Sequence, residues 1–150
     1  MIPVQKSWSD KDPHVAAAQI IAGDVAGQAM PKLVNKTWGY ELHYHNNENY
    51  CMKLLHFNGP LPDTTVDMKD TSVSTSMHFH VKKHETLLVV SGVLTLELIV
   101  NKKTIIHKLE PGHAWVVCPG HIHRLSACDG PLELIEASTI DYDDDSVRVN

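Results

Sequence analysis

The chain has 150 residues, of which 43% are hydrophobic and 21% charged, and its formal net charge is −5. This length and composition support one globular domain with a single hydrophobic core. No basic stripe runs along the sequence, which argues against nucleic-acid binding by phosphate neutralisation. No apolar run is long enough for a transmembrane helix or a signal sequence, so no membrane partner is expected.

The N-terminal part of the chain predicts a helical extension. Asp12 followed by Pro13 is typical of a helix N-cap and its first helical position. The Ala-rich stretch 15–30, interrupted at Gly23, predicts one or two short helices that end near Pro31. We therefore assign residues 1–36 to a helical extension that packs on the outside of the domain or on a partner chain.

From Thr37 onward the pattern changes to short strands separated by turn signals such as Ser91-Gly92 and Asn101-Lys102. The expected strands are 37–45, 50–57, 75–81, 86–91, 93–100, 103–109, 114–118, 122–127 and 131–138. Many short strands without intervening helices predict an all-β antiparallel sandwich or barrel. We assign residues 37–150 to this one β-barrel.

The three cysteines, Cys51, Cys118 and Cys128, form no CxxC pair, so a thiolate zinc site is not expected. Their odd number and wide spacing fit a reducing compartment, where buried thiols pack as small hydrophobes. Together with the lack of a signal core, this predicts a cytoplasmic protein.

Histidine is unusually frequent, with 11 residues in the chain, and it is the commonest metal ligand. His78 and His80 stand on one face of an expected strand because side chains alternate along a strand. Glu85 follows across a Lys-rich turn, and His123 lies between two apolar strands. Three imidazoles and one carboxylate on neighbouring strands can bind one divalent ion and leave positions open for substrate. His121 shares the strand parity of His123 and is a rival ligand.

This set resembles the two sequence motifs of the cupins. The first motif, His-x-His, four residues, Glu, six residues and Gly, matches His78-x-His80, Glu85 and Gly92 at every spacing. The second matches Gly112, Pro119-Gly120 and His123, although Pro119 and Gly120 are adjacent rather than separated by one residue. The resemblance covers about residues 37–140. It implies a single cupin (jelly-roll) barrel that binds one divalent metal through His78, His80, Glu85 and His123. Zn or Mn is expected, and Fe, Ni or Co also suits these ligands.

Two narrower resemblances point to sugar chemistry. Trp38-Gly39-Tyr40-Glu41, Tyr50 with Lys53, the segment 131–136 and the acidic tail 141–148 are similar to the cupin domain of type II mannose-6-phosphate isomerases. The spacing His78-x-His80-x-x-Lys83-x-Glu85 is similar to the metal motif of D-lyxose isomerase cupins, in which a lysine at this spacing serves in proton transfer. This second resemblance implies a catalytic role for Lys83.

An aldose–ketose isomerase moves a proton between adjacent carbons, which requires a Lewis acid and an acid/base pair. Lys83 beside a cation is expected to have a lowered pKa. Glu136, on the last long strand, is its expected catalytic partner, with Glu97 and Glu41 as alternatives.

Three further residues, Arg124, Lys53 and His43, are expected to bind substrate. Asp141, Asp143 and Asp145 imitate half of a calcium loop but lack its glycine and closing glutamate, so a solvated tail is expected.

The sequence thus predicts a metal-dependent cupin that isomerises a sugar or sugar phosphate of the mannose or lyxose type, as a homodimer. Two alternatives remain open, a non-catalytic sugar-binding cupin and an iron-dependent dioxygenase. A dioxygenase usually has a more apolar pocket, and the polar side chains expected around the metal argue against it.

Overall fold

The computed structural model describes residues 12–15 and 26–150. Almost all regular structure in these residues is β-strand, which confirms the all-β prediction. In chain order the strands are β1 (Lys32–Lys36), β2 (Gly39–Asn46), β3 (Cys51–Phe57), β4 (His78–His80), β5 (Glu85–Ser91), β6 (Leu94–Val100), β7 (Lys103–Leu109), β8 (Ala114–Val117), β9 (Ile122–Ser126), β10 (Leu132–Ser138) and β11 (Ser146–Arg148).

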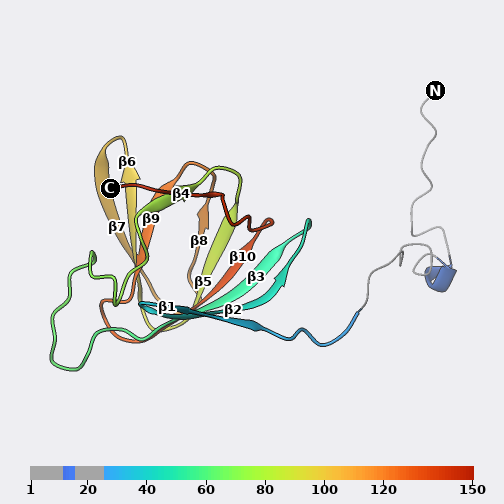
Figure 1. The fold of residues 1–150 in the computed structure, drawn as a ribbon, viewed down its shortest axis with the longest axis horizontal. Coiled ribbons are helices and arrows are strands. Elements are labelled where there is room, and N and C mark those ends of the chain that lie inside the picture. The colour runs from blue at the N-terminus through green and yellow to red at the C-terminus, as the bar shows by residue number, and fades with distance from the viewer. Residues whose placement is uncertain (1–11, 16–25) are drawn as a thin grey trace.

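Two antiparallel sheets face each other (Figure 1). One sheet has six strands in the order β1-β2-β3-β10-β5-β8, and the other has five in the order β11-β4-β9-β6-β7. Strands that are distant in sequence lie side by side, since β10 pairs with both β3 and β5. The arrangement brings residues from the middle and the end of the chain into one interior.

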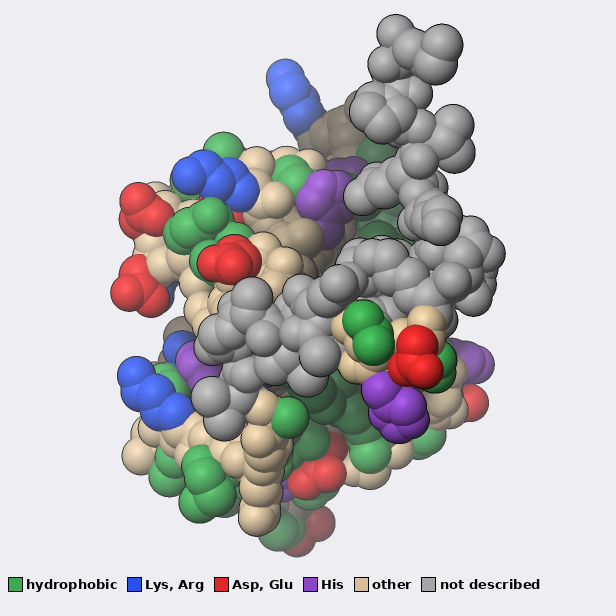
Figure 2. Space-filling view, turned by 90° about the vertical axis from the view of Figure 1, so that its right-hand side faces the viewer, with side chains coloured by type: hydrophobic (Ala, Val, Ile, Leu, Met, Phe, Trp, Pro, Cys, Tyr) green, Lys and Arg blue, Asp and Glu red, His purple; other side chains and the backbone are tan. Residues whose placement is uncertain are grey.

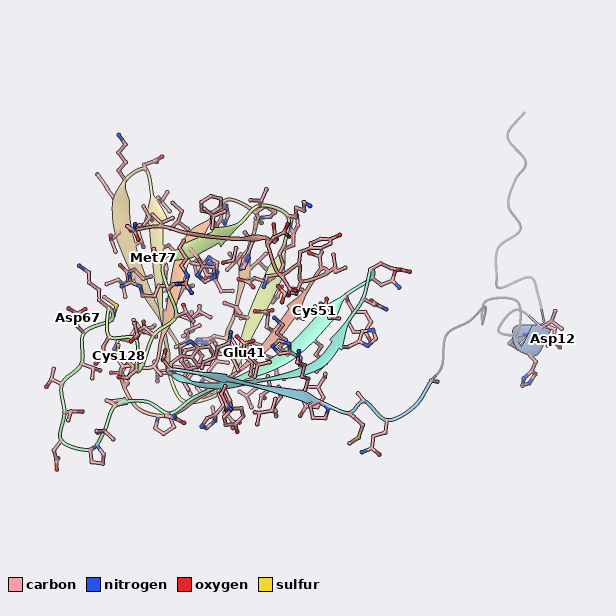
Figure 3. The ribbon with its side chains drawn as sticks, in the orientation of Figure 1. Asp12, Glu41, Cys51, Asp67, Met77 and Cys128 are labelled. Carbon is pink, nitrogen blue, oxygen red and sulfur yellow. The ribbon has the colours of Figure 1, made fainter. Side chains whose placement is uncertain are left out.

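Side chains alternate between the interior and the outside along the strands. In β3, Cys51, Lys53, Leu55 and Phe57 are buried while the residues between them are exposed or half-buried. This period of two is typical of antiparallel strands that cover a core with one face. Figure 3 shows the side chains filling the space between the sheets, with Met77, just before β4, and Cys51, at the start of β3, on opposite sides. Lys53 and Glu136 occupy inward positions among the leucines, so they need polar partners inside the barrel.

Two of the turn signals have a clear physical reason. Asn101 and Lys102 both have positive φ, at 51° and 62°, which is the backbone of a two-residue type I′ hairpin turn between β6 and β7. Gly92 has a φ of +80°, and a Cβ there would lie 2.2 Å from the carbonyl oxygen of Pro131. Only glycine fits this close approach of two chain segments.

All nine expected strands are present, although the strand expected at 75–81 covers only His78–His80. Two strands were not expected, β1 and β11. β1 falls within the residues assigned to the extension and pairs antiparallel with β2. β11 is only three residues long and obtains its place from pairing with β4.

The helical extension is described only in part. Residues 13–15 form one helical turn, and the Asp12 side chain accepts hydrogen bonds from the backbone N–H groups of His14 and Val15, which confirms the expected cap. Residues 26–30 have no regular structure, so the expected helix does not reach Met30. The rest of the predicted helical stretch, residues 16–25, lies outside the described residues. Among the described residues, no helix is long and apolar enough to cross a membrane.

Candidate metal centre

Three histidines meet between the two sheets. His78 and His80 lie on β4, His123 lies on β9, and His78 is the direct ladder partner of His123. One ring nitrogen from each lies within 4.8 Å of the others. The rings of His78 and His123 are 4.4 Å apart between centroids, and those of His78 and His80 are 5.0 Å apart. The alternation of side chains along β4 therefore does bring both of its histidines to one face.

Hydrogen bonds fix the orientation of two of these rings. His78 Nδ1 lies 2.8 Å from the carbonyl oxygen of Ser76, and His123 Nδ1 lies 2.9 Å from that of His121. A carbonyl can only accept, so each Nδ1 carries the proton and each Nε2 is the candidate ligand atom. The Nδ1 atom of His80 is buried without a hydrogen-bond partner in the described part of the chain.

Glu85 reaches this cluster from the opposite sheet, at the start of β5. Its Oε1 atom lies 2.9 Å from His123 Nε2 and 3.8 Å from His80 Nε2, and the residue is only 3% exposed. Three imidazoles and a carboxylate, converging in a buried place with oriented rings, fit a divalent transition-metal ion.

The environment favours the metal-binding protonation states of His78, His80 and Glu85. Burial, and then the nearby His123, lower the pKa of His78 to about 4. Burial also lowers the pKa of His80, and the charge of Lys83 adds to this. Burial would raise the pKa of Glu85, but contact with His123 and the charge of Lys83 outweigh it and hold that pKa below its usual value. Neutral imidazoles and an ionised carboxylate are the metal-binding forms.

A buried network of charges lies directly behind Glu85. Lys83 is 4% exposed, and its Nζ atom lies 3.1 Å from Glu85 Oε2, 3.3 Å from Glu136 Oε2 and 3.3 Å from Asp141 Oδ1. Lys53 pairs with the same Asp141 carboxylate and lies 3.9 Å from Glu136 Oε2. Two lysines thus share three carboxylates next to the histidine cluster.

The structure contradicts the expected lowering of the Lys83 pKa. Burial acts in that direction, but the carboxylates of Glu136, Glu85 and Asp141 outweigh it and raise the pKa above the ordinary lysine value. The pKa of Glu136 moves to about 7, because burial and the charge of Glu85 raise it more than Lys83 and Lys53 lower it. Lys83 is therefore a persistent cation here, and the carboxyl of Glu136 is the group near neutrality.

The structure brings some of the other expected site residues to this network and leaves others apart. His43 is the ladder partner of Lys53 and lies 2.6 Å, Nε2 to Oε2, from Glu41. Arg124 occupies the other phase of β9 from His123, where its Nη1 atom lies 3.4 Å from Glu97 Oε2 and 3.4 Å from the carbonyl oxygen of Met68. Neither Arg124 nor Glu97 is brought to the histidine cluster.

His121, the rival ligand, lies outside the histidine cluster, and two aspartates of the acidic tail are not solvated as expected. His121 is exposed, and its Nδ1 atom lies 3.4 Å from the backbone nitrogen of Cys118, which leaves His123 as the histidine of this loop in the cluster. The solvated tail expected from the sequence is wrong at two positions. Asp141 is paired with both lysines, and Asp145 is only 4% exposed. Sequence reasoning missed Asp141 as a site residue, and its signals were the alternation of aspartates and the place of the acidic tail in the resemblance to mannose-6-phosphate isomerases.

A cavity of about 410 Å³ lies between the edge strand β8 and the turn that joins β6 and β7. Its walls include Leu98, which is the ladder partner of His123, and Trp115, which is the ladder partner of Leu87. A second cavity, of about 640 Å³, lies against Tyr44, Tyr50 and Met52 of the β2–β3 hairpin, among residues that do not belong to the cluster.

Sequence comparison places this geometry in a family. Residues 64–143, more than half of the chain, match the family model described as Cupin. This protein belongs to the cupin family. The matched range includes all four residues of the candidate metal centre, as well as Lys83, Glu136 and Asp141. No match is found among the curated proteins.

Several solved cupin structures have the same fold at low sequence identity. The capsular polysaccharide assembling protein CapF from Staphylococcus aureus aligns with a TM-score of 0.64 and 15% identity, over 81% of this cupin and 34% of CapF. KdgF from Halomonas sp. aligns with a TM-score of 0.61 and 14% identity, over 80% of this cupin and 98% of KdgF. Oxalate decarboxylase from Bacillus subtilis aligns with a TM-score of 0.66 and 12% identity, over 99% of this cupin and 40% of that enzyme. This cupin thus spans about a third of CapF and well under half of the decarboxylase, and the likeness shows the shared fold.

Proposed function

We propose that this cupin is a metal-dependent isomerase that moves a proton between adjacent carbons of a sugar or sugar phosphate. The observation that carries the proposal is the Lys83–Glu136 pair, whose Nζ and Oε2 atoms lie 3.3 Å apart, directly behind Glu85. An aldose–ketose isomerase needs a group that takes up and returns a proton next to a Lewis acid. The carboxyl of Glu136, with a pKa of about 7, suits this role, and Lys83 is its fixed cationic partner beside Glu85.

The proposed roles follow from the charges. A divalent ion held by His78, His80, Glu85 and His123 would supply Lewis acidity toward sugar oxygens. Glu136 Oε2 accepts the proton from the hydroxyl-bearing carbon and returns it to the neighbouring carbonyl carbon, while the hydroxyl proton passes to the former carbonyl oxygen. Lys83 Nζ keeps its proton, orients both carboxylates and favours the ionised form of Glu136.

The polar interior supports a hydroxyl-rich substrate. Lys53, Asp141 and His43 extend the row of hydrogen-bonding groups away from the histidines, and Asp141 and His43 are partly exposed. The same groups weigh against an apolar dioxygenase pocket. We propose Zn or Mn as the metal, and one of the related oxalate decarboxylase structures concerns Mn(II) centres. The resemblance to mannose-6-phosphate and D-lyxose isomerases stays a prediction about the substrate.

The test is an isomerase screen of the purified protein. It uses aldoses and ketoses with and without phosphate, after reconstitution with Zn, Mn, Fe, Ni or Co. Glu136→Gln should lower kcat by on the order of a hundredfold, while Glu133→Gln, a matched control on the outer phase of β10, should leave it unchanged. If the wild type binds sugars but converts none of them, the protein is a non-catalytic sugar-binding cupin.

We also propose that this protein forms a homodimer through the outer face of the six-stranded sheet. A continuous row of ladder neighbours crosses that face, formed by Leu33, Leu42, Leu54, Ile135 and Leu88. Leu33 is 56% exposed and Leu88 is 37% exposed, while Leu42, Leu54 and Ile135 between them are half-buried. A row of apolar side chains that reaches the surface is typical of a protein interface. We propose no nucleic-acid partner. Among the described residues in Figure 2, the basic side chains (blue) are scattered rather than gathered.

We propose a cytoplasmic location, and the free state of all three cysteines agrees with it.

A further inference from the structure

The C-terminal segment runs along the strand that carries two of the candidate metal ligands. β11 pairs antiparallel with β4, so that Ser146 lies opposite His80 and Arg148 lies opposite His78. The segment is dark red in Figure 1, where it passes beside β4. Val149 continues the pairing, since its backbone N–H donates to the carbonyl oxygen of Met77 at 2.8 Å.

Residues of the C-terminal segment, from Thr139 onward, also bind the backbone of residues 81–84, which connect His80 to Glu85. The Asp145 carboxylate accepts the backbone N–H groups of Val81 at 3.1 Å and Lys82 at 2.9 Å through Oδ1, and that of Lys83 at 2.9 Å through Oδ2. Three successive backbone donors that converge on one anion form a nest. The next N–H, that of His84, donates to Thr139 Oγ1 at 3.1 Å. All four backbone N–H groups between these two candidate ligands therefore bind residues of the C-terminal segment.

We propose that Asp145 is a positioning residue of the metal centre, a role that rests on the proposed metal site. Its carboxylate fixes the path of residues 81–84, and this path sets where His80, Lys83 and Glu85 stand relative to one another. Removal of the carboxylate leaves the backbone N–H groups of Lys82 and Lys83 without their acceptor and frees the connection to relax. The Val81 N–H keeps the backbone carbonyl oxygen of Asp145, at 3.2 Å. Loss of such supporting hydrogen bonds costs on the order of 10- to 100-fold in metal affinity.

The experiment measures the dissociation constants of Zn²⁺ and Mn²⁺ in the full chain by competition with a chromophoric chelator. The variants are Asp145→Asn and Asp145→Ala. The controls are Asp143→Asn and Asp144→Asn, because these exposed carboxylates have no hydrogen-bond or ion-pair partner among the described residues. Thr139→Val removes only the acceptor of the His84 N–H and serves where an Asp145 variant does not fold. The Co²⁺ absorption spectrum reports the ligand geometry separately from affinity.

We expect both Asp145 variants to bind metal about 10- to 100-fold more weakly and to shift the Co²⁺ spectrum. Thr139→Val should weaken binding to a smaller extent, and both controls should match the wild type. Formate, which can enter the vacated nest, should restore part of the affinity of Asp145→Ala. Wild-type affinity and spectrum in Asp145→Asn or, where that variant is unfolded, in Thr139→Val overturn the proposal, even if the melting temperature falls. A wild type that binds none of these metals overturns the metal site itself.

Discussion

Lys83→Met tests whether the buried lysine holds the charge network together. The substitution keeps the length of the side chain and removes the cation that lies 3.1 Å from Glu85 and 3.3 Å from both Glu136 and Asp141. Breaking a buried ion pair by removing one partner costs about 3–5 kcal/mol. Lys53 still pairs with Glu136 and Asp141, and His123 still contacts Glu85, so we expect the low end of this range, about 3 kcal/mol.

The pH dependence gives this prediction a sign. Without Lys83 the pKa of Glu136, already raised to about 7, rises further. As the pH falls through that value the carboxyl becomes neutral, and the charge left uncompensated disappears. In the wild type, Glu85 and Asp141 have lowered pKa values. Their contribution to the free energy of unfolding is fully present above the unfolded-state pKa of each carboxyl. It is lost as the pH falls through the folded-state pKa. The deficit of Lys83→Met should therefore be larger at pH 8 than at pH 5.5.

The assay is urea unfolding at both pH values in the presence of a chelator, since bound metal would add its own stabilisation. Lys82→Met is the matched control, because Lys82 is the adjacent exposed lysine. Glu136→Leu in the Lys83→Met background should recover part of the loss, as Leu132 and Leu134 occupy the same inward phase of β10. A Lys83→Met protein that unfolds within about 0.5 kcal/mol of Lys82→Met at both pH values would refute the network argument.

Three further outcomes follow from the site and the sheets. His123→Ala should abolish stoichiometric metal binding while His121→Ala retains it, as measured by metal analysis after dialysis, and the reverse result would make His121 the ligand. The metal-free protein should lose stability as the pH falls from 6.5 toward about 4, because the pKa of His78 is lowered to about 4 and the unfolded chain takes up that proton first. His78→Gln should remove part of this slope in thermal unfolding. Leu54→Asp, in the middle of the outer apolar row, should give a monomer by light scattering. The control Val100→Asp, at the exposed end of β6, should stay a dimer. A wild type that is already monomeric contradicts the proposed interface.

The sequence by itself determined most of the strand pattern and the candidate metal ligands. Inward and outward side chains alternate with a period of two, so His78 and His80 had to share a face wherever that strand lay. The positive φ values at Asn101 and Gly92 are local backbone conformations that asparagine and glycine favour. The motif spacing that resembles the cupins added His123 and Glu85, and the matched family model confirms that family.

Only the tertiary structure decided what surrounds those candidate ligands. Lys83 gains its raised pKa from Glu136 on β10 and from Asp141 after it, and both are more than fifty residues away in sequence. The pairing of Arg124 with Glu97 depends on the register of β9 against β6, and the burial of Asp145 depends on the pairing of β11 with β4. A pKa depends on the charges that folding brings within a few ångströms. A buried carboxylate depends on the backbone donors that it meets there. The local sequence predicts neither the pKa of Lys83 nor the burial of Asp145, because both depend on contacts that form only when the barrel closes.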